Sequence, residues 1–285
     1  MTPEIKQLPA GLTFVATPIG TARDITLRAL DTLASADVLA AEDTRTLRHL
    51  MQIHGIALGD RPLIAYHDHN GAAVRPRLLR LMAEGKSVAY ASEAGTPLVA
   101  DPGYHLATEA IAAGIAVTSA PGPSAVIAAL SIAGLPTDRF LFAGFVPAAK
   151  GARTEWLREV GAVPATLVIY ESPKRINRTL DEMVQCFGPE RYAAVCRELT
   201  KRFEEVLRGS LGELAQELSG RTLKGEIVVV VDRDRRVPDA GTLEDALKDA
   251  LTEMSIKDAA TAVSQALGLP RRQVYQAALK LGKTE

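Results

Sequence analysis

The sequence is poor in cysteine, in aromatic residues and in long apolar runs. Its 285 residues include two cysteines, Cys186 and Cys196, which do not form a ligand-like pair. This excludes a disulfide-stapled fold and fits a reducing compartment. The longest apolar runs, such as 227–231, fall far short of the ~20 residues that span a bilayer. No charged-then-apolar segment opens the chain either, so we expect a cytoplasmic protein without a membrane anchor.

The sequence also lacks a strong net charge and the common phosphate-binding motifs. The formal charge is −1, so any contact with nucleic acid has to come from local basic patches. Neither G-x-G-x-x-G nor G-x-x-x-x-G-K-[ST] occurs, which removes the usual cradles for dinucleotides and nucleoside triphosphates. A nucleoside ligand without phosphates needs neither cradle, so the absence loosely favours an adenosyl group.

Short apolar runs alternate with amphipathic stretches through the first 135 residues. This βαβα order predicts a mostly parallel sheet covered by helices, with strands that are apolar on both faces. One predicted helix has Ile25, Leu27, Leu30 and Leu33 at helical spacing. The predicted strands are 12–16, 37–41, 62–65, 87–91 and 115–118.

A change of composition near 136–153 predicts the connection to a second α/β domain. Because only 199–202 separates two of its predicted strands, they should form an antiparallel hairpin in a mixed sheet. The predicted strands are 140–145, 166–171, 192–198, 203–207 and 226–231, with helices at 153–160, 173–187 and 210–219. The chain is long enough for two domains of ordinary size with some residues to spare. We therefore predict an α/β domain at 1–135, a second α/β domain at 136–237 and a helical unit at 238–285.

The final segment has three short helical patterns after a charged linker at 232–239. Ser255 and Asp258 have the spacing of a capping box, and Gly268 then interrupts the pattern. The arrangement predicts a helix-turn-helix unit, a fold that often contacts phosphates and also serves as a packing or dimer module. Its second helix carries the basic residues Arg271, Arg272 and Lys280.

Three turns rich in Gly and Pro share one layout, each after a predicted strand and before a predicted helix. In open α/β sheets ligands bind outside the carboxyl ends of the strands, so the turns should converge on one crevice. Gly and Pro keep the backbone compact and close to a ligand. The turns are Thr17-Pro18-Ile19-Gly20, Ser92-Glu93-Ala94-Gly95-Thr96-Pro97 and Ala120-Pro121-Gly122-Pro123-Ser124-Ala125.

A set of motifs in a fixed order carries a family resemblance. The motifs are 15–20, 24–29, 36–37, 42–45, 94–97, 101–103, 121–125, 134–140, 170–173, 197–201 and 224–226. On these motifs, residues 11–232 resemble the ribosomal RNA small subunit methyltransferase I family of the tetrapyrrole methylase superfamily, and the helical tail also fits. The family usually has Asp before Ala-Gly-Thr-Pro. Here Glu93 places the carboxylate one methylene further out.

The resemblance implies two α/β domains with S-adenosylmethionine in the cleft between them, usually in a homodimer. It implies 2′-O-methylation of a cytidine in the decoding centre of 16S rRNA, with free rRNA or the assembled small ribosomal subunit as substrate. Tyr170 fits equally a role in the donor pocket and a half-buried strand position. The expected donor-binding residues are Pro18, Ile19, Gly20, Ser92, Glu93, Gly95, Thr96, Pro97, Ser124, Ala125 and Tyr170.

Methyl transfer to a ribose hydroxyl sets the demands on the catalytic residues. Alignment of donor and acceptor supplies much of the rate, and a base or a cation should lie beside the weakly nucleophilic hydroxyl. The alternative for the segment around Arg197 and Lys201 is a solvated hairpin with weak ion pairs. The candidates, among which the sequence does not single out the base, are Asp43, Arg45, Glu171, Arg197 and Lys201.

The run His67, Asp68 and His69 is a possible metal-binding sequence. Possible further histidine ligands include His54 and His105, and transfer from a sulfonium needs no Lewis acid. We therefore expect no metal and interpret the run as a polar loop near the RNA entrance.

Three other functions fit parts of the sequence. A corrin or siroheme-precursor methyltransferase of the same fold is the nearest, although such enzymes typically have Gly-Asp-Pro where Gly95-Thr96-Pro97 stands and lack the helical tail. A diphthamide-pathway methyltransferase is a weaker alternative. The third is a non-catalytic RNA-binding ribosome-assembly factor, against which the intact turns and the motif at 197–201 argue.

Overall fold

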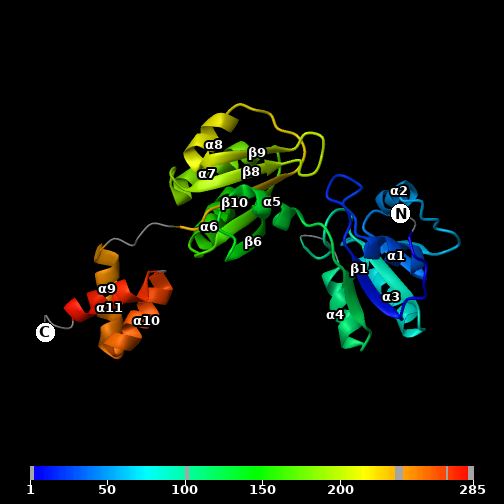
Figure 1. Ribbon diagram of the computed structural model, residues 1–285, viewed down its shortest axis with the longest axis horizontal. Helices are drawn as coiled ribbons and strands as arrows, with labels where there is room; N and C mark the ends of the chain where they lie inside the picture. Colours follow the sequence, from blue (N-terminus) through cyan, green and yellow to red (C-terminus); the bar gives the residue numbers. More distant parts are fainter. Residues whose placement is uncertain (1–2, 100–102, 235–239, 268, 282–285) are drawn as a thin grey trace. The chain divides into compact units, whose positions relative to one another are not determined.

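The computed structural model describes residues 3–99, 103–234, 240–267 and 269–281. The chain divides into two compact units, Met1–Val160 with Thr166–Asp232 and Gly161–Ala165 with Arg233–Glu285. The larger unit holds two β-sheets and the smaller one holds helices (Figure 1). The predicted boundary at 237/238 lies outside the described residues, as do Asp101, Pro102 and Gly268.

The first sheet is entirely parallel, as predicted. Its strand order is β3-β2-β4-β1-β5, so β1 lies between β4 and β5. All four residues of β2 and all five of β4 are buried, which the continuous apolar runs predicted. The strands are β1 (Gly11–Val15), β2 (Val38–Ala41), β3 (Leu63–Ala65), β4 (Ser87–Ala91) and β5 (Val117–Ala120).

Helices cover both faces of this sheet. On one face, α1 (Leu27–Ser35) and α2 (Thr44–Ile53) bury Leu33 and Met51 in one hydrophobic cluster. On the other, α3 (Gly71–Ala83) and α4 (Tyr104–Ala112) bury Leu78 and Leu106 in a second cluster. The result is the three-layer arrangement that the βαβα pattern predicted.

The strands β1, β2 and β3 begin one residue from their predicted starts, and helix caps explain two further differences, at the starts of α1 and β5. The helix α1 begins after Ile25, since the Thr26 hydroxyl accepts the Ala29 N–H and caps the first turn. The strand β5 begins two residues later than predicted. Ile115 donates its N–H to Ala110 O, and the preceding Gly114 has φ +72°. Ile115 thus completes a Schellman C-cap of α4, where an apolar residue is also favoured.

The second sheet is mixed, with the predicted antiparallel hairpin. Its order is β6-β7-β10-β8-β9, in which only β6 and β7 run parallel. The last hairpin strand begins at Glu205, so the predicted strand at 203–207 was placed two residues too early. The strands are β6 (Phe140–Phe145), β7 (Thr166–Glu171), β8 (Tyr192–Arg197), β9 (Glu205–Ser210) and β10 (Ile227–Val231).

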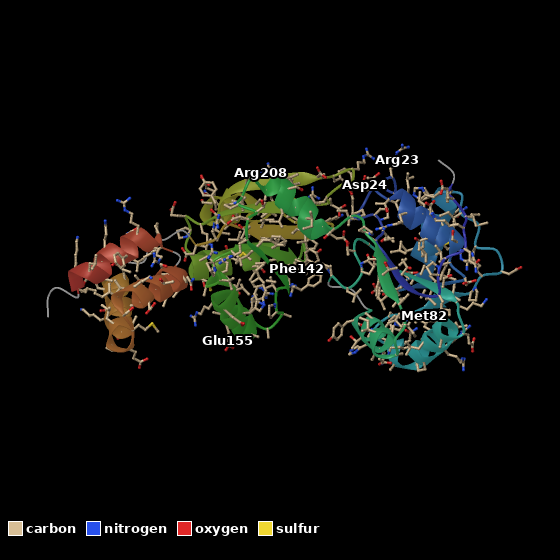
Figure 2. All side chains as sticks on the ribbon, turned by 60° about the horizontal axis from the view of Figure 1, so that its bottom comes forward. Arg23, Asp24, Met82, Phe142, Glu155 and Arg208 are labelled. Atoms are coloured by element: carbon tan, nitrogen blue, oxygen red, sulfur yellow. The ribbon has the colours of Figure 1, made fainter. Side chains whose placement is uncertain are left out.

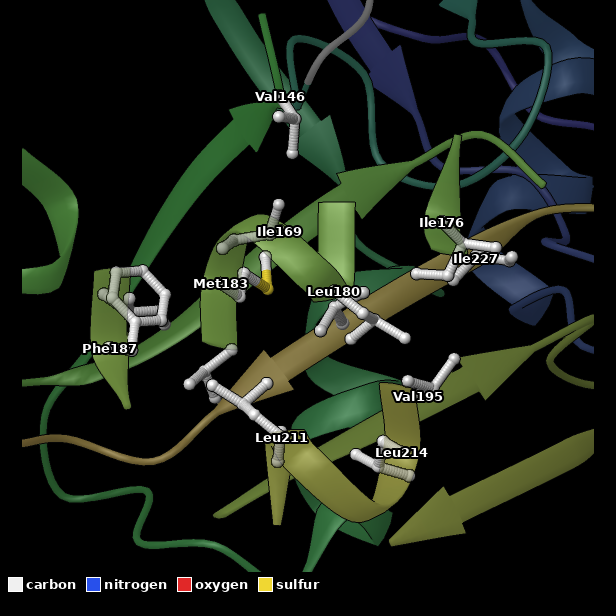
Figure 3. Close-up of a cluster of buried hydrophobic side chains, with 14 of the residues drawn as sticks. Val146, Ile169, Ile176, Leu180, Met183, Phe187, Val195, Leu211, Leu214 and Ile227 are labelled. Atoms are coloured by element: carbon white, nitrogen blue, oxygen red, sulfur yellow. The ribbon is translucent and has the colours of Figure 1, made fainter. Parts of the chain in front are cut away.

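Three helices pack on the second sheet around one core. They are α6 (Lys150–Gly161), α7 (Ile176–Phe187) and α8 (Leu211–Leu218). Figure 3 shows Met183 of α7 beside Ile169 of β7, and Leu214 of α8 belongs to the same hydrophobic cluster. The helix α8 starts with a capping box between Ser210 and Glu213.

The helix α5 (Ala125–Ala133) follows β5 of the first sheet but packs on the second. Its residues Val126 and Leu130 share a hydrophobic cluster with strand residues of β7, β8 and β10, including Val230. Arg208 of β9, labelled in Figure 2, donates to Ile132 O near the end of α5 (3.1 and 2.5 Å). Although α5 precedes the predicted boundary at 135/136, its apolar face belongs to the second sheet. The division of the larger unit at that boundary stays a prediction.

The smaller unit confirms the three helical patterns at the end of the sequence. These are α9 (Ala240–Glu253), α10 (Ile256–Leu267) and α11 (Arg271–Leu281), packed around Leu247, Val263 and Val274. Asp258 N donates to the Ser255 hydroxyl (3.2 Å), which is half of the predicted capping box. The basic residues predicted on the second helix lie on α11.

Both cysteines lie in the larger unit. Cys196 is buried in the cluster beneath α5, and burial raises the pKa of its thiol to about 11. The thiol therefore stays protonated and unreactive near neutral pH. No helix in the described ranges is long and apolar enough to cross a membrane.

One ion pair is buried in the second sheet's helical layer. The Arg153 side chain of α6 is 1% exposed, and it donates two hydrogen bonds to Glu182 of α7 (2.5 and 2.7 Å). A further guanidinium N–H bonds Ala148 O at 2.7 Å. This bonding lowers the pKa of Glu182 and raises that of Arg153. The pair fixes how α6 lies against α7.

Replacing Glu182 with Ala should therefore strongly destabilise the protein. The substitution leaves a buried guanidinium uncompensated, for which we expect a loss of about 3–5 kcal/mol in the free energy of unfolding. Urea unfolding followed by circular dichroism measures it. The matched control is Glu217→Ala, which removes a half-exposed carboxylate 3.9 Å from Arg221 and should change stability by less than about 0.5 kcal/mol. Equal losses in the two variants would contradict the assignment.

Candidate functional site

The three Gly- and Pro-rich turns come together at one edge of the first sheet. They follow β1, β4 and β5, and these strands are neighbours in the order β4-β1-β5. Because the sheet is parallel, the carboxyl ends of all three strands lie at the same edge. The predicted convergence of the turns is confirmed.

Hydrogen bonds lock the turns to one another. Thr17 and Gly95 exchange both backbone hydrogen bonds (2.9 and 3.0 Å). The buried Ser92 hydroxyl donates to Gly95 O (2.5 Å), and Thr96 Oγ1 donates to Pro123 O (2.8 Å). Gly95 has φ +82°, a conformation that favours glycine. These hydroxyls hold the shape of the turns.

A cavity of about 340 Å³ opens beside the turns. Its walls come from both sheets, with Ile19, Ala94 and Ala125 contributed by the turns. The second sheet and its loops supply Phe145, Tyr170, Glu171, Ser172, Pro173, Gly225, Glu226, Ile227 and Val228. The volume is in the range of small-molecule sites, and the wall is mostly apolar with a few polar groups. This composition fits a nucleoside-sized ligand.

The predicted donor residues divide into two groups. Ile19, Ala125 and Tyr170 line the cavity. The others shape or flank the turns around it: Pro18, Gly20, Ser92, Glu93, Gly95, Thr96, Pro97 and Ser124. Sequence reasoning missed Ala94, Phe145 and the wall formed by 225–228, although the motifs at 170–173 and 224–226 already pointed to this part of the chain.

Tyr170 sits among aromatic rings at the cavity. Its ring lies edge-on to Phe142 (4.8 Å between centroids) and to Phe145 (5.3 Å). Burial raises the pKa of its hydroxyl, so the group stays protonated at neutral pH. The residue is half-buried on β7 and lines the cavity, so the two interpretations of this tyrosine are compatible.

The loop between β8 and β9 packs against the turn that follows β1. Thr21 N donates to Thr200 Oγ1 (3.2 Å). A Cβ atom on Gly20 would collide with Thr200 and Lys201. Within the loop, Glu198 (φ +52°) and Thr200 (φ +63°) have left-handed backbone conformations, which are unfavourable for residues other than glycine. Strain of this kind concentrates at functional sites.

Lys201 joins this loop to the cavity wall. Its ammonium bonds Glu198 Oε1 (2.9 Å) and Glu226 Oε2 (2.8 Å), and Glu226 lines the cavity. Although burial opposes the charge, bonding to the two carboxylates raises the pKa of Lys201. The Glu198 side chain fills the space where a Cβ of Gly225 would lie, and Gly225 has φ +91°. Glycine is thus required in the motif at 224–226.

The remaining predicted catalytic side chains each bond to residues other than the partners of Lys201. Asp43 caps α2, and bonds from Arg45 lower the pKa of its carboxyl to about 2. Glu171 accepts bonds from Ser172 N, Thr179 Oγ1 and Arg175 Nη2, each at 2.6 Å. Both carboxylates are therefore engaged in local structure. Arg197 pairs with Glu205 (3.0 Å), an ion pair of the kind the hairpin alternative described, although the pair is part-buried rather than solvated.

Glu42, next to Asp43 at the end of β2, was not singled out from the sequence. Burial raises the pKa of its carboxyl, and the nearby carboxylates of Glu93 and Asp68 raise it further. Perturbed carboxylates of this kind are enriched at functional sites. Glu93, the position that departs from the family pattern, is thus electrostatically coupled to Glu42.

The histidines do not assemble into a metal site in the part of the chain that the structure describes. No group of three or more His, Cys, Asp or Glu side chains there is arranged to hold an ion. His67 and His69 lie edge to face, 5.9 Å apart, and His54 Nε2 is bonded to Ala22 O (2.9 Å).

Comparison with known proteins gives consistent family matches. Residues 11–215 match the tetrapyrrole (corrin/porphyrin) methylases, and residues 237–282 match the RsmI C-terminal HTH domain. The ribosomal RNA small subunit methyltransferase I of Mesorhizobium japonicum is 46% identical, covering 98% of this chain and 95% of the relative. The protein of the same name from Escherichia coli O157:H7 is 41% identical, covering 94% of each chain.

Solved structures with the same fold are more distant in sequence. Diphthine synthase superposes with a TM-score of 0.61 at 19% identity, over 78% of this chain and 89% of that one. Uroporphyrin-III-C-methyltransferase from Thermus thermophilus gives a TM-score of 0.53 at 23% identity, over 77% and 94%. At this identity the likeness shows the fold alone.

The coupling between Glu93 and Glu42 has a measurable consequence. In Glu93→Gln, the pKa of Glu42 should fall, because a negative neighbour that opposes its ionisation is removed. Titration of the carboxyl carbons by NMR measures it. Glu84→Gln, an exposed change at the end of α3, is the control and should leave Glu42 unchanged. If Glu93→Gln also leaves the Glu42 titration in place, the coupling is absent.

Proposed function

Since the chain belongs to the ribosomal RNA small subunit methyltransferase I family, a group of tetrapyrrole methylases, we propose that it methylates 16S rRNA. The donor is S-adenosylmethionine, and the acceptor is the 2′-hydroxyl of a cytidine in the decoding centre. The observation that supports this most is the cavity beside the three turns, whose far wall carries Glu226 with Lys201 bonded to it. A donor site and groups suited to a hydroxyl acceptor thus adjoin.

The cavity fits the donor in size and chemistry. The small side chains of Ala94 and Ala125 leave space beside the turns, and the aromatic residues Phe145 and Tyr170 line the cavity, which suits an adenine. S-Adenosylmethionine supplies a methyl group on a positively charged sulfur. The protein's part is to hold this group in line with the acceptor oxygen, and such alignment supplies much of the rate.

Lys201 and Glu226 are suited to act on the ribose hydroxyl. An ammonium has three N–H donors, of which Lys201 uses two on Glu198 and Glu226. The third can donate to the hydroxyl oxygen and stabilise the charge that develops there. With the donor bound, the Glu226 carboxylate would accept the proton that the hydroxyl loses when its oxygen takes the methyl group. Arg45, which is bonded to Asp43 and whose side chain is 90% exposed, contacts RNA phosphate in this proposal.

Other parts of the proposal extend beyond this site. The basic face of α11, with Arg271 and Arg272, serves as an RNA contact. The protein acts in the cytoplasm as a homodimer, on free 16S rRNA or the small subunit. A corrin or siroheme-precursor substrate is the runner-up, because residues 11–215 match the tetrapyrrole (corrin/porphyrin) methylases. The sequence identity to rRNA methyltransferases favours RNA.

Filling the cavity should block donor binding without unfolding the protein. Ala94 is exposed and lines the cavity, so Ala94→Trp puts an indole into the space rather than into the core. We expect the affinity for S-adenosylmethionine to fall about ten-fold or more, as measured by calorimetry. Ala112→Trp, on the exposed side of α4, is the control. Unchanged donor binding in Ala94→Trp would place the donor elsewhere.

The reaction is tested by transfer of tritium from labelled S-adenosylmethionine to small ribosomal subunits that lack this methylation. Nucleoside analysis should show label on 2′-O-methylcytidine. Lys201→Ala and Glu226→Gln should each lower kcat by about 10²-fold or more, while the exposed control Lys150→Ala keeps its rate. Donor binding without label on RNA would reject the rRNA assignment, and transfer of label to an added corrin or siroheme precursor in a parallel reaction would support the runner-up.

A further inference from the structure

A second cavity, of about 400 Å³, lies at the same edge of the first sheet but away from the donor cavity. It is formed where the chain leaves β3 and where α3 and α4 begin, so residues from all three segments face it. In the sheet order, β3 is three strand positions from β1, which is about 14 Å at the usual strand spacing. No part of the proposed reaction uses this cavity.

Its wall is unusually rich in rings for this protein. The whole sequence has 6 tyrosines and 5 histidines among 285 residues, yet four of the nine residues around the cavity are rings. They are Tyr66, His67, Tyr104 and His105. Tyr104 is 66% exposed, and its ring lies edge-on to His105 at 5.4 Å. An exposed tyrosine at the rim of a cavity that is lined by aromatic and imidazole rings can stack on a planar ligand.

Polar groups at the cavity suit the edge of such a ligand. The Arg75 guanidinium is ion-paired with Glu109 (2.7 Å) and bonds the Tyr66 hydroxyl (3.4 Å). His67 Nδ1 is buried and has no hydrogen-bond partner within the described ranges. The exposed carboxylate of Asp68 adds hydrogen-bond acceptors, so the polar groups that line the cavity include both donors and acceptors. A nucleobase presents both kinds of group on its edge.

The charges at this edge favour a base over a phosphate. Burial raises the pKa of the nearby Glu42 carboxyl, and the negative charges of Glu93 and then of Asp68 raise it further. Accumulated negative charge repels a phosphate group but accepts hydrogen bonds from the exocyclic amines of bases. Exposed aromatic rings stack on bases of any sequence.

We propose that this second cavity binds an unstacked base of the RNA strand that carries the target nucleotide. The proposal rests on the proposed function and deepens it. The base in the cavity flanks the target and fixes the strand, so that the ribose hydroxyl reaches Lys201. Stacking on Tyr104 supplies affinity, and Asp68 with His67 reads the base edge.

The test compares Tyr104→Ala with Tyr192→Ala, which removes a tyrosine of similar exposure (59%) on β8. Tyr104→Ala should weaken the binding of unmethylated small subunits by about ten-fold, the effect of losing one stacked base. KM rises accordingly, while kcat at saturation, S-adenosylmethionine affinity and the melting temperature stay at wild-type values. Tyr104→Phe, which keeps the ring, should restore binding, and Tyr192→Ala should bind like wild type.

Ultraviolet cross-linking of the wild-type protein to the subunits locates the contact. A cross-link between an rRNA base and Tyr104 or His105 supports the proposal. Wild-type binding by Tyr104→Ala, or a cross-link from this cavity to a ribosomal protein, would overturn it. Failure of the proposed function is separately visible, because the wild-type protein itself would then leave the RNA unlabelled.

Discussion

The packing of α5 on the second sheet is the contact on which the site depends. The helix leaves the first sheet through the turn after β5, yet its apolar face is buried against β7, β8 and β10. Alanines at 129 and 133 let the helix lie close to the strands, and burial of apolar surface holds it there. Ala125, the first residue of α5, therefore faces the cavity of about 340 Å³ whose opposite wall is the second sheet.

A second contact closes the same region from the other side. The loop after β8 fits against the turn after β1 because Gly20 has no side chain at the point of contact. That fit brings Lys201 to the cavity wall, where Glu198 and Glu226 hold it. This cavity is thus the space between the turns, which the hydroxyls of Ser92 and Thr96 hold in place, and the loop after β8, which an ion-pair network holds. Its shape depends on backbone positions more than on large side chains.

Much of this was visible in the sequence, and the rest depended on contacts between distant segments. Strands 140–145 and 166–171 were predicted to the residue, because their apolar runs are bounded by turn residues. The start of β5 was missed because Ile115 serves a helix cap. The turns were predicted, but Phe145 and Val228 were not, since which strand residues face a cavity depends on how two sheets meet. Asp43 and Glu171 looked like free carboxylates, and only their bonds to Arg45 and Arg175 show that they are engaged.

The left-handed backbone at Glu198 and Thr200 carries a cost for the folded protein as a whole. Each such residue is less favourable than a right-handed one by roughly 1–2 kcal/mol, and a typical domain is stable by only about 5–15 kcal/mol. Glycine at either position would relieve the strain. At 198, however, it would remove the carboxylate that bonds Lys201, and at 200 it would remove the hydroxyl that accepts the Thr21 N–H. Variants of this protein selected for higher thermal stability would therefore have to gain that stability at other positions.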